Sequence, residues 1–291
     1  MNNPKIQKKI SVIIATYNAH NYIRACLSSI LKQTYKNFEI LIIDNNSSDD
    51  TLKIVHSLKS KIITIIKNHE NMGFAKANNI GIKEGIRNGS EYLLLLNQDT
   101  LVESNLLKKL SFYSDILKDA GAISPAILIK KNKRIWWIGT HIFPLRELFE
   151  ESRASIGKHI RKEKENYNLK KPKEVEAITG CSMFIPKNTI EKIGLFDEKF
   201  FMYGEDIDYS LRMKKEGFRM YIIPNTTVYH DVSIENEQNT SNLKKSIMKI
   251  YNYTLSNYIN IIKHFSLTYL AIWSIRLPIV AIYELIKRKT K

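Results

Sequence analysis

The stretch Ile10–Ala15, ISVIIA, is a mostly apolar, β-branched run with the length of one buried strand. Phe38–Ile43 (FEILII), Ile62–Ile66 (IITII) and Tyr92–Leu96 (YLLLL) have the same character. The intervening segments show helical spacing of apolar residues, over 22–33, 51–58 and 73–88. Apolar strands that alternate with helices predict an α/β, doubly wound, mostly parallel sheet with helices on both faces.

Polar clusters follow three of these strands. They are Thr16–Asn18, Asp44–Asp49 and Asn97–Thr100. Ligands of such sheets bind beyond the carboxyl ends of the strands, so the three clusters are expected at one binding edge. Any single cluster is equally typical of an ordinary turn or helix cap, because Asn, Asp and Ser favour both.

The alternation of strands and helices ends after about residue 105. We therefore expect one domain with two halves. Residues 1–105 form the half that carries the binding edge, and residues 106–240 form the second half. Residues 241–291 have helical periodicity and are expected to form a separate helical segment.

Bulk composition is that of a globular protein. The chain has 291 residues, of which 44% are hydrophobic and 25% charged, and this excludes wholesale disorder and a multi-span membrane protein. Cys26 and Cys181 cannot form a disulfide framework, and no secretory leader pattern opens the sequence, so we expect a reducing, cytoplasmic setting.

The net charge of +16 favours an anionic partner, either nucleic acid, a phosphorylated small molecule or an acidic membrane. We find no nucleic-acid-binding motif in the sequence, which argues against the first. Basicity without a specific partner is an equally good interpretation.

Five motifs carry a family resemblance. In order they are SVIIATYN (11–18), ILIIDNNSSDDT (40–51), NMGFAKANNIGI (71–82), LLLLNQDT (93–100) and the segment Gly180–Phe218 that contains FFMYGEDIDYS. This set resembles glycosyltransferase family 2, with the GT-A fold, and especially its rhamnosyltransferase-like branch. The resemblance implies inverting transfer of a sugar from a nucleotide-diphosphate donor to an acceptor hydroxyl.

The resemblance also implies a set of donor-binding residues: Thr16, Asn18, Asp44, Asn46, Gly73, Ala77, Asn97 and Asp99. Asp44 offers acceptor oxygens to the imide N–H of a base. Gly73 and Ala77 are expected to leave a helix N-terminus open to an anion or a ribose. A plain helix-start glycine is the alternative for Gly73.

A divalent metal, Mg²⁺ or Mn²⁺, is implied as cofactor. Relatives place two carboxylates where this sequence has Asn97-Gln98-Asp99, so Asp99 is the expected ligand and Asn97 an expected ribose contact. His230 occupies the position of a second ligand, and imidazole favours Mn²⁺. A structural histidine is the alternative.

The acidic cluster Gly204-Glu205-Asp206-Ile207-Asp208 is the sharpest feature of the sequence. Mutual repulsion and partial burial raise a carboxylate pKa toward the range useful for proton abstraction. By resemblance Asp206 is the catalytic base and Glu205 orients the acceptor. Asp208 is expected to pair with Arg212, four residues along one helix.

Trp137, Gly180 and Tyr203 lie where relatives bind the acceptor. Aromatic rings stack on sugars, although Trp136 and Trp137 are equally typical of a hydrophobic core. The Gln-x-x-Arg-Trp motif of processive relatives is absent, which favours addition of a single sugar.

The C-terminal stretch Phe265–Ile286 is long and apolar but contains Arg276, Pro278 and Glu284, which disfavour a membrane span. With the basic end Lys287–Lys291 it predicts a peripheral association with anionic lipids of the inner membrane surface. Packing on the catalytic domain or a homodimer contact is the alternative.

Together these features predict a non-processive transferase that moves rhamnose from dTDP-rhamnose to a polyprenyl-diphosphate-linked glycan, in O-antigen, capsule or cell-wall biosynthesis. A UDP-hexose or UDP-N-acetylhexosamine donor is one alternative. A nucleotidyltransferase or a basic nucleic-acid-binding protein is an alternative from another class.

Overall fold

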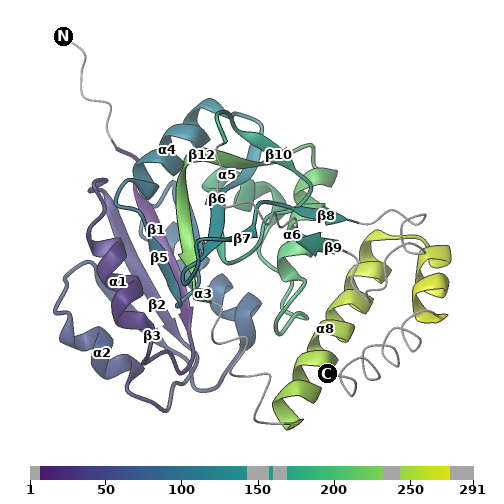
Figure 1. Cartoon of the computed structure of the whole chain (residues 1–291), viewed down its shortest axis with the longest axis horizontal. Coiled ribbons are helices and arrows are strands. Elements are labelled where there is room, and N and C mark those ends of the chain that lie inside the picture. The colour runs from purple at the N-terminus through teal and green to yellow at the C-terminus, as the bar shows by residue number, and fades with distance from the viewer. Residues whose placement is uncertain (1–6, 143–156, 160–168, 232–242, 276–291) are drawn as a thin grey trace.

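The structure, a computed structural model, describes residues 7–142, 157–159, 169–231 and 243–275. Strands and helices alternate through its first third, as the sequence predicts (Figure 1). The elements are β1 (Ile10–Thr16), α1 (Ile23–Leu31), β2 (Phe38–Asp44), α2 (Thr51–Ser57), β3 (Ile63–Lys67), α3 (Gly73–Arg87) and β4 (Tyr92–Leu96).

These four strands are parallel, in the order β4-β1-β2-β3. The register pairs Thr16, the last residue of β1, with Asp44, the last residue of β2. The polar segments that follow the two strands therefore begin side by side at one edge of the sheet.

The second half of the chain extends the same sheet. Its elements are β5 (Thr100–Val102), α4 (Leu106–Ile116), β6 (Ala120–Ile129), β7 (Ile135–Trp137), β8 (Thr140–Ile142), β9 (Gly157–His159), β10 (Lys173–Val175), β11 (Ser182–Pro186), α5 (Lys187–Ile193), α6 (Glu205–Lys215) and β12 (Arg219–His230). The main strand order is β10-β12-β6-β11-β4-β1-β2-β3, and β5 and β7 pair with β12 and β6.

The strand β11 runs antiparallel to β4, with Ser182 opposite Leu96. An antiparallel neighbour begins where its partner ends, so the residues before β11 arrive at the edge where β4 ends. This reversal brings Gly180 and Cys181 to the predicted binding edge from far along the sequence.

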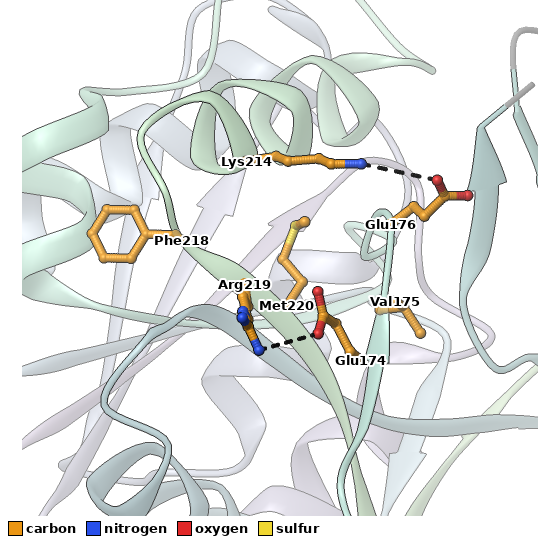
Figure 2. Close-up of a pocket in the computed structure, with 7 residues that line it drawn as sticks. All are labelled: Glu174, Val175, Glu176, Lys214, Phe218, Arg219 and Met220. Carbon is orange, nitrogen blue, oxygen red and sulfur yellow. Dashed lines mark ion pairs between the residues drawn. The ribbon is translucent and has the colours of Figure 1, made fainter. Parts of the chain in front are cut away.

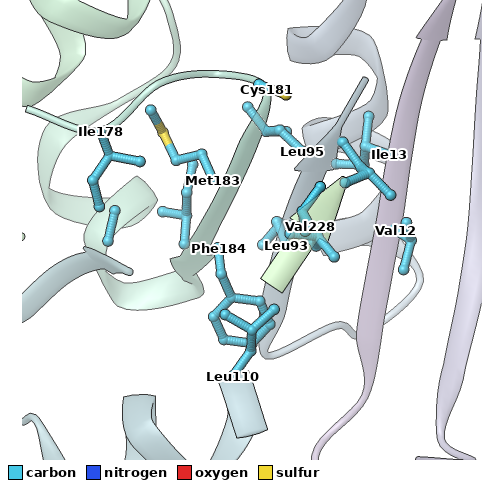
Figure 3. Packing of buried hydrophobic residues seen from close by; sticks show 14 of the residues in the cluster. Val12, Ile13, Leu93, Leu95, Leu110, Ile178, Cys181, Met183, Phe184 and Val228 are labelled. Carbon is cyan, nitrogen blue, oxygen red and sulfur yellow. The ribbon is translucent and has the colours of Figure 1, made fainter. Parts of the chain in front are cut away.

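The core lies between the sheet and its helices, and Val12, Ile13, Leu95 and Phe184 belong to it (Figure 3). Helix α3 packs on β1 and β2. A Cβ on Gly81 would lie 2.4 Å from the Ile13 side chain, so glycine allows this close approach of helix and sheet.

The C-terminal helix α8 (Leu243–His264) packs on α6, away from the central sheet (Figure 1). Residues 267–275 are also helical, and Tyr269 and Trp273 pack with Ile261 in a small second cluster. Within the described ranges, we find no helix with the length and hydropathy needed to cross a bilayer. The predicted interfacial stretch is described up to residue 275, and its remainder with Lys287–Lys291 lies outside the described residues.

Candidate active site

Hydrogen bonds tie the three polar loops at the sheet edge into one unit. The Asn18 N–H donates to Ser47 Oγ (3.0 Å), and Asn18 Oδ1 accepts from the Ser48 N–H (2.9 Å). The Tyr17 N–H donates to Gln98 Oε1 (2.8 Å), and Gln98 Nε2 donates to the Tyr17 carbonyl (3.3 Å). Gln98 thus fastens the loop after β4 to the loop after β1, a role that the sequence analysis missed.

Asp44 is completely buried at the end of β2. Its Oδ1 accepts from Thr16 Oγ1 (3.3 Å) and its Oδ2 from the Ser47 N–H (3.1 Å). Asn46, two residues later, is exposed and has a left-handed backbone with φ 62°. The structure places these residues together at the edge, while contact of Asp44 with a base stays a prediction.

The amino end of α3 differs from the expectation of an open anion site. The Gly73 N–H donates to Asn71 Oδ1 (3.0 Å) and the Phe74 N–H to the Phe201 carbonyl (2.7 Å), so these two groups are occupied. A Cβ on Gly73 would lie 2.2 Å from the Phe201 carbonyl oxygen, and φ is 80°. Gly73 is therefore required where α3 touches the segment before the acidic cluster. Ala77 is buried in the core and does not line an open surface.

Asp99 and His230 lie together, although 131 positions separate them in the sequence numbering. Asp99 Oδ2 is 3.1 Å from His230 Nε2, and both side chains are largely buried. His230 on β12 pairs with Thr100 on β5, and this pairing brings His230 next to Asp99, the residue before Thr100. The Trp136 ring stands edge-on to the imidazole, with centroids 4.6 Å apart.

The spacing of these two atoms fits a metal site. Two neighbouring ligands of an octahedral ion, each bonded at about 2.1 Å, lie about 3 Å apart. In the part of the chain that the structure describes, no group of three or more His, Cys, Asp or Glu side chains could hold a metal. The protein would therefore supply two ligands, and water and phosphate oxygens the others, as hard divalent ions prefer.

Asp206 lies near the same edge. Its Oδ2 accepts from the Gly180 N–H (3.1 Å) and its Oδ1 from the Ile207 N–H (2.9 Å). The carbonyl of Cys181, the residue after Gly180, accepts from the Asn97 N–H (3.0 Å). A short chain of hydrogen bonds thus links the segment that carries Asp99 to the acid at position 206.

Glu205 and Asp206 form a coupled acidic pair. Burial raises the pKa of Asp206, although its backbone hydrogen bonds act in the opposite direction. Burial and the neighbouring charge of Asp206 raise the pKa of Glu205 well above its ordinary value. Glu205 Oε2 has no hydrogen-bond partner among the described residues. The proton of the pair therefore belongs on Glu205 and the charge on Asp206, where N–H donors stabilise it.

Asp208 anchors the helix that carries the pair. Its Oδ2 is 2.9 Å from Arg212 Nε, which confirms the predicted pair. Its Oδ1 is 2.6 Å from Lys263 Nζ and 2.8 Å from His264 Nε2, both on α8. Despite burial, hydrogen bonds from His264 and Lys263 and the charge of Arg212 lower the pKa of Asp208 to about 2.

Helix α8 also holds residues 202–204, which we call the corner before α6. Tyr203 and Gly204 both have left-handed backbones, with φ 73° and 80°. Asn260 Nδ2 donates to the Gly204 carbonyl (2.9 Å), and Ser256 Oγ to the Met202 carbonyl (3.3 Å). The sequence analysis missed these contacts, since Asn260 and Ser256 belong to no motif.

The predicted acceptor residues separate in the structure. Gly180 contacts Asp206, and Tyr203 stands edge-on to Tyr253 with centroids 6.0 Å apart. Trp137 is fully buried and donates its Nε1–H to Thr140 Oγ1 (3.0 Å). The interpretation of Trp137 as a core residue is therefore correct. A fully buried ring has no free face on which a sugar could stack, contrary to the predicted acceptor contact.

A hollow of about 280 Å³ lies elsewhere, lined by residues of β10, α6 and the start of β12 (Figure 2). Arg219 Nη1 is 3.6 Å from Glu174 Oε2, and Lys214 Nζ is 4.0 Å from Glu176 Oε1. This hollow adjoins the first residue of β12, whereas His230 is the last. It is therefore separate from the candidate active site.

The mostly parallel sheet with an antiparallel β11, and the acids that distant segments bring near one edge, are the features expected of a GT-A glycosyltransferase. Residues 11–191 match the family model described as Glycosyl transferase family 2, and the chain belongs to this family. It is 26% identical over 233 residues to the dTDP-rhamnosyl transferase RfbF of Shigella flexneri, an alignment covering 78% of this chain and 70% of that protein. It is 32% identical over 205 residues to an uncharacterised glycosyltransferase of Rickettsia typhi, over 68% of this chain and 56% of that protein.

A shorter match covers about a third of this chain. The chain is 39% identical over 103 residues to the UDP-Glc:alpha-D-GlcNAc-diphosphoundecaprenol beta-1,3-glucosyltransferase WfaP of Escherichia coli, over 35% of this chain and 40% of that protein. Among solved structures, GalNAc-T7 with UDP, GalNAc and Mn²⁺ has a TM-score of 0.64 at 17% identity, over 78% of this chain and 44% of that one. Staphylococcus aureus TarS with UDP has a TM-score of 0.53 at 20% identity, over 79% and 62%.

Proposed function

We propose that the protein is an inverting, non-processive glycosyltransferase in which Asp206 is the catalytic base. The observation that supports this role most directly is the environment of Asp206. The Gly180 and Ile207 N–H groups fix its carboxylate, while burial raises its pKa. A base held in one orientation with a raised pKa suits abstraction of a hydroxyl proton.

The proposed donor is dTDP-rhamnose. The Shigella relative is named as a dTDP-rhamnosyl transferase, which supports this choice, and the WfaP match supports a UDP-hexose as the alternative. Thr16, Asn18, Asp44 and Asn46 would hold the nucleoside at the joined loops after β1 and β2. The half-buried side chain of Asn97 would contact the ribose.

The proposed reaction is a single displacement. The acceptor oxygen attacks the anomeric carbon, the bond to the diphosphate breaks with its electron pair leaving on the phosphate oxygen, and the acceptor proton moves to Asp206. Asp99 and His230 would hold a divalent ion, which would stabilise the negative charge on the departing phosphate. Glu205, buried beside Asp206 with a raised pKa, would orient the acceptor.

The proposed acceptor is a hydroxyl of a lipid-linked glycan, in the biosynthesis of a cell-surface polysaccharide. The name of WfaP includes a diphosphoundecaprenol-linked sugar as its substrate, which supports this class of acceptor. Such an acceptor places the enzyme on the cytoplasmic face of the membrane. The net charge of +16 supports contact with anionic lipids there.

The test is Asp206→Asn in the full chain, with release of nucleoside diphosphate measured over a panel of nucleotide sugars, with and without Mn²⁺ or Mg²⁺. Loss of a general base should slow transfer by about 10² to 10⁴-fold. Donor affinity, measured by calorimetry, should stay unchanged because Asp206 does not lie among the proposed donor contacts.

Asp197→Asn is the matched control, since that carboxylate lies on a neighbouring loop and pairs with Lys263. It should transfer sugar at the wild-type rate. Near-wild-type transfer by Asp206→Asn with donor binding retained would refute the assignment of the base.

A further inference from the structure

Helix α8 presents its polar side to the rest of the protein. Ser256, Asn257 and Asn260 are buried, with exposed fractions of 4%, 5% and 0%. Ser256 and Asn260 donate to carbonyls of the corner before α6, and Lys263 reaches Asp208 on α6. These hydrogen bonds and ion pairs, with the inward-facing Ile259 and Ile261, therefore hold α8 on the catalytic half.

The apolar side of α8 faces outward. Ile247, Tyr251, Leu255, Tyr258 and Ile262 follow one another at spacings of four, four, three and four residues, which places them in one stripe along a helix. Their exposed fractions are 56%, 59%, 39%, 43% and 55%. We call these five residues the outer stripe.

This arrangement is the reverse of an ordinary surface helix, which turns its apolar stripe to the core. Rotation of α8 about its axis would not correct it. Rotation would remove the hydrogen bonds of Ser256 and Asn260 and take the Lys263 ammonium and the His264 ring away from the buried Asp208, which is costly. The outer stripe is thus fixed in the exposed position by the polar contacts on the other side.

We propose that the outer stripe docks on an anionic lipid bilayer, with α8 lying in the plane of the interface. The stripe combines aliphatic side chains with Tyr251 and Tyr258, the composition of helices that insert shallowly among headgroups. From Leu243 onward the sequence has one acidic residue, Glu284, among many Lys and Arg. Charge complementarity favours anionic lipid over a second copy of this basic chain, which would bring like charges together.

Helix α8 also contacts the segment that leads to the proposed base. Phe201 and Met202 in this segment are 42% and 38% exposed, and Ser256 of α8 donates to the Met202 carbonyl just before Asp206. Docking of α8 would therefore hold the base-bearing corner at a fixed position relative to the bilayer. This last step rests on the proposed function, whereas lipid docking itself does not.

The experiment uses the full chain and vesicles of phosphatidylglycerol with phosphatidylethanolamine, or of phosphatidylcholine alone, in a co-sedimentation assay. The wild type should bind the anionic vesicles, and added salt should weaken binding because part of the attraction is electrostatic. The double variant Leu255→Glu, Ile262→Glu should bind at least about tenfold more weakly.

The matched control is Phe112→Glu, Ile116→Glu, which changes two exposed apolar residues of α4, with exposed fractions of 57% and 52%, and should keep wild-type binding. Both double variants should keep the wild-type unfolding transition, because the changed side chains are exposed.

Equal binding of wild type and the α8 variant would overturn the proposal. Loss of a dimer by the α8 variant in light scattering, without a change in vesicle binding, would also overturn it in favour of contact between copies. Nucleoside-diphosphate release with a soluble acceptor is measured in parallel. Its absence from the wild type would refute the proposed function and leave the docking result standing.

Discussion

Replacing Asp208 by Asn tests whether α8 is an integral part of the catalytic half. The Asp208 side chain is completely buried and meets Arg212, Lys263 and His264 at 2.9, 2.6 and 2.8 Å. Asparagine has nearly the same volume but no charge, so the change removes the electrostatic contact and leaves the packing.

The structure gives the magnitude. Lowering the pKa of Asp208 from 3.8 to about 2 corresponds to about 2 kcal/mol of stability at neutral pH. Removing one partner of a buried ion pair costs about 3 to 5 kcal/mol. The Arg212, Lys263 and His264 side chains are 12% to 29% exposed and reach water in part, so we expect the lower end, about 3 kcal/mol.

The pH dependence has a defined sign. The native pKa of Asp208 lies below its unfolded value, so its contribution is complete above about pH 4 and is lost as the pH falls toward about 2. In the Asp208→Asn variant, the free energy of unfolding should no longer show this loss between about pH 4 and about pH 2.

The assay is urea unfolding followed by circular dichroism at pH 7 and over an acid series. Asp197→Asn is the control, because Asp197 pairs with the same Lys263 at 2.7 Å but is 22% exposed, and about 1 kcal/mol or less is expected. An Asp208→Asn variant that loses no more stability than this control would refute the reasoning.

Three further predictions concern the active site. In Gly180→Ala the new Cβ would lie 2.8 Å from the Phe74 ring and 3.9 Å from Asp206 Cβ, so transfer should slow at least about tenfold as the base shifts; wild-type turnover in a nucleoside-diphosphate release assay would contradict this. Because burial raises the pKa of Asp206, kcat/KM should fall as the pH drops through a value above the ordinary 3.8, and an acid limb at or below 3.8 would count against Asp206 as base. His230→Gln should raise the Mn²⁺ concentration for half-maximal activity at least about tenfold, and an unchanged metal titration would remove His230 as ligand.

The first half of the fold follows directly from the sequence. β-Branched strands with helical segments between them dictate the parallel sheet, because local periodicity sets each element and parallel connections bring the strand ends to one edge. The same local rule predicts the pair of Asp208 and Arg212, four residues apart on α6, and the structure confirms it.

Two residues near the predicted site have tertiary contacts that the sequence does not show. Gly73 does begin α3, but its N–H and that of Phe74 are occupied, the latter by the Phe201 carbonyl from another part of the chain. Trp137 is a core side chain. From the sequence, Gly73 is a small residue and Trp137 an aromatic residue near the predicted site. The packing of distant segments decides which groups each one contacts.

The sequence by itself determined the parallel sheet and the edge at which its polar loops meet, and it predicts which acids carry the chemistry. Only the tertiary structure decided that the antiparallel β11 delivers Gly180 to Asp206, and that α8 holds the corner before α6. Helical periodicity shows which residues of α8 share a side, such as Tyr251 with Leu255, but not which side turns inward. That choice depends on partners distant in the chain, here the buried Asp208 and the carbonyl of Gly204, whose hydrogen-bonding needs outweigh the burial of the apolar stripe.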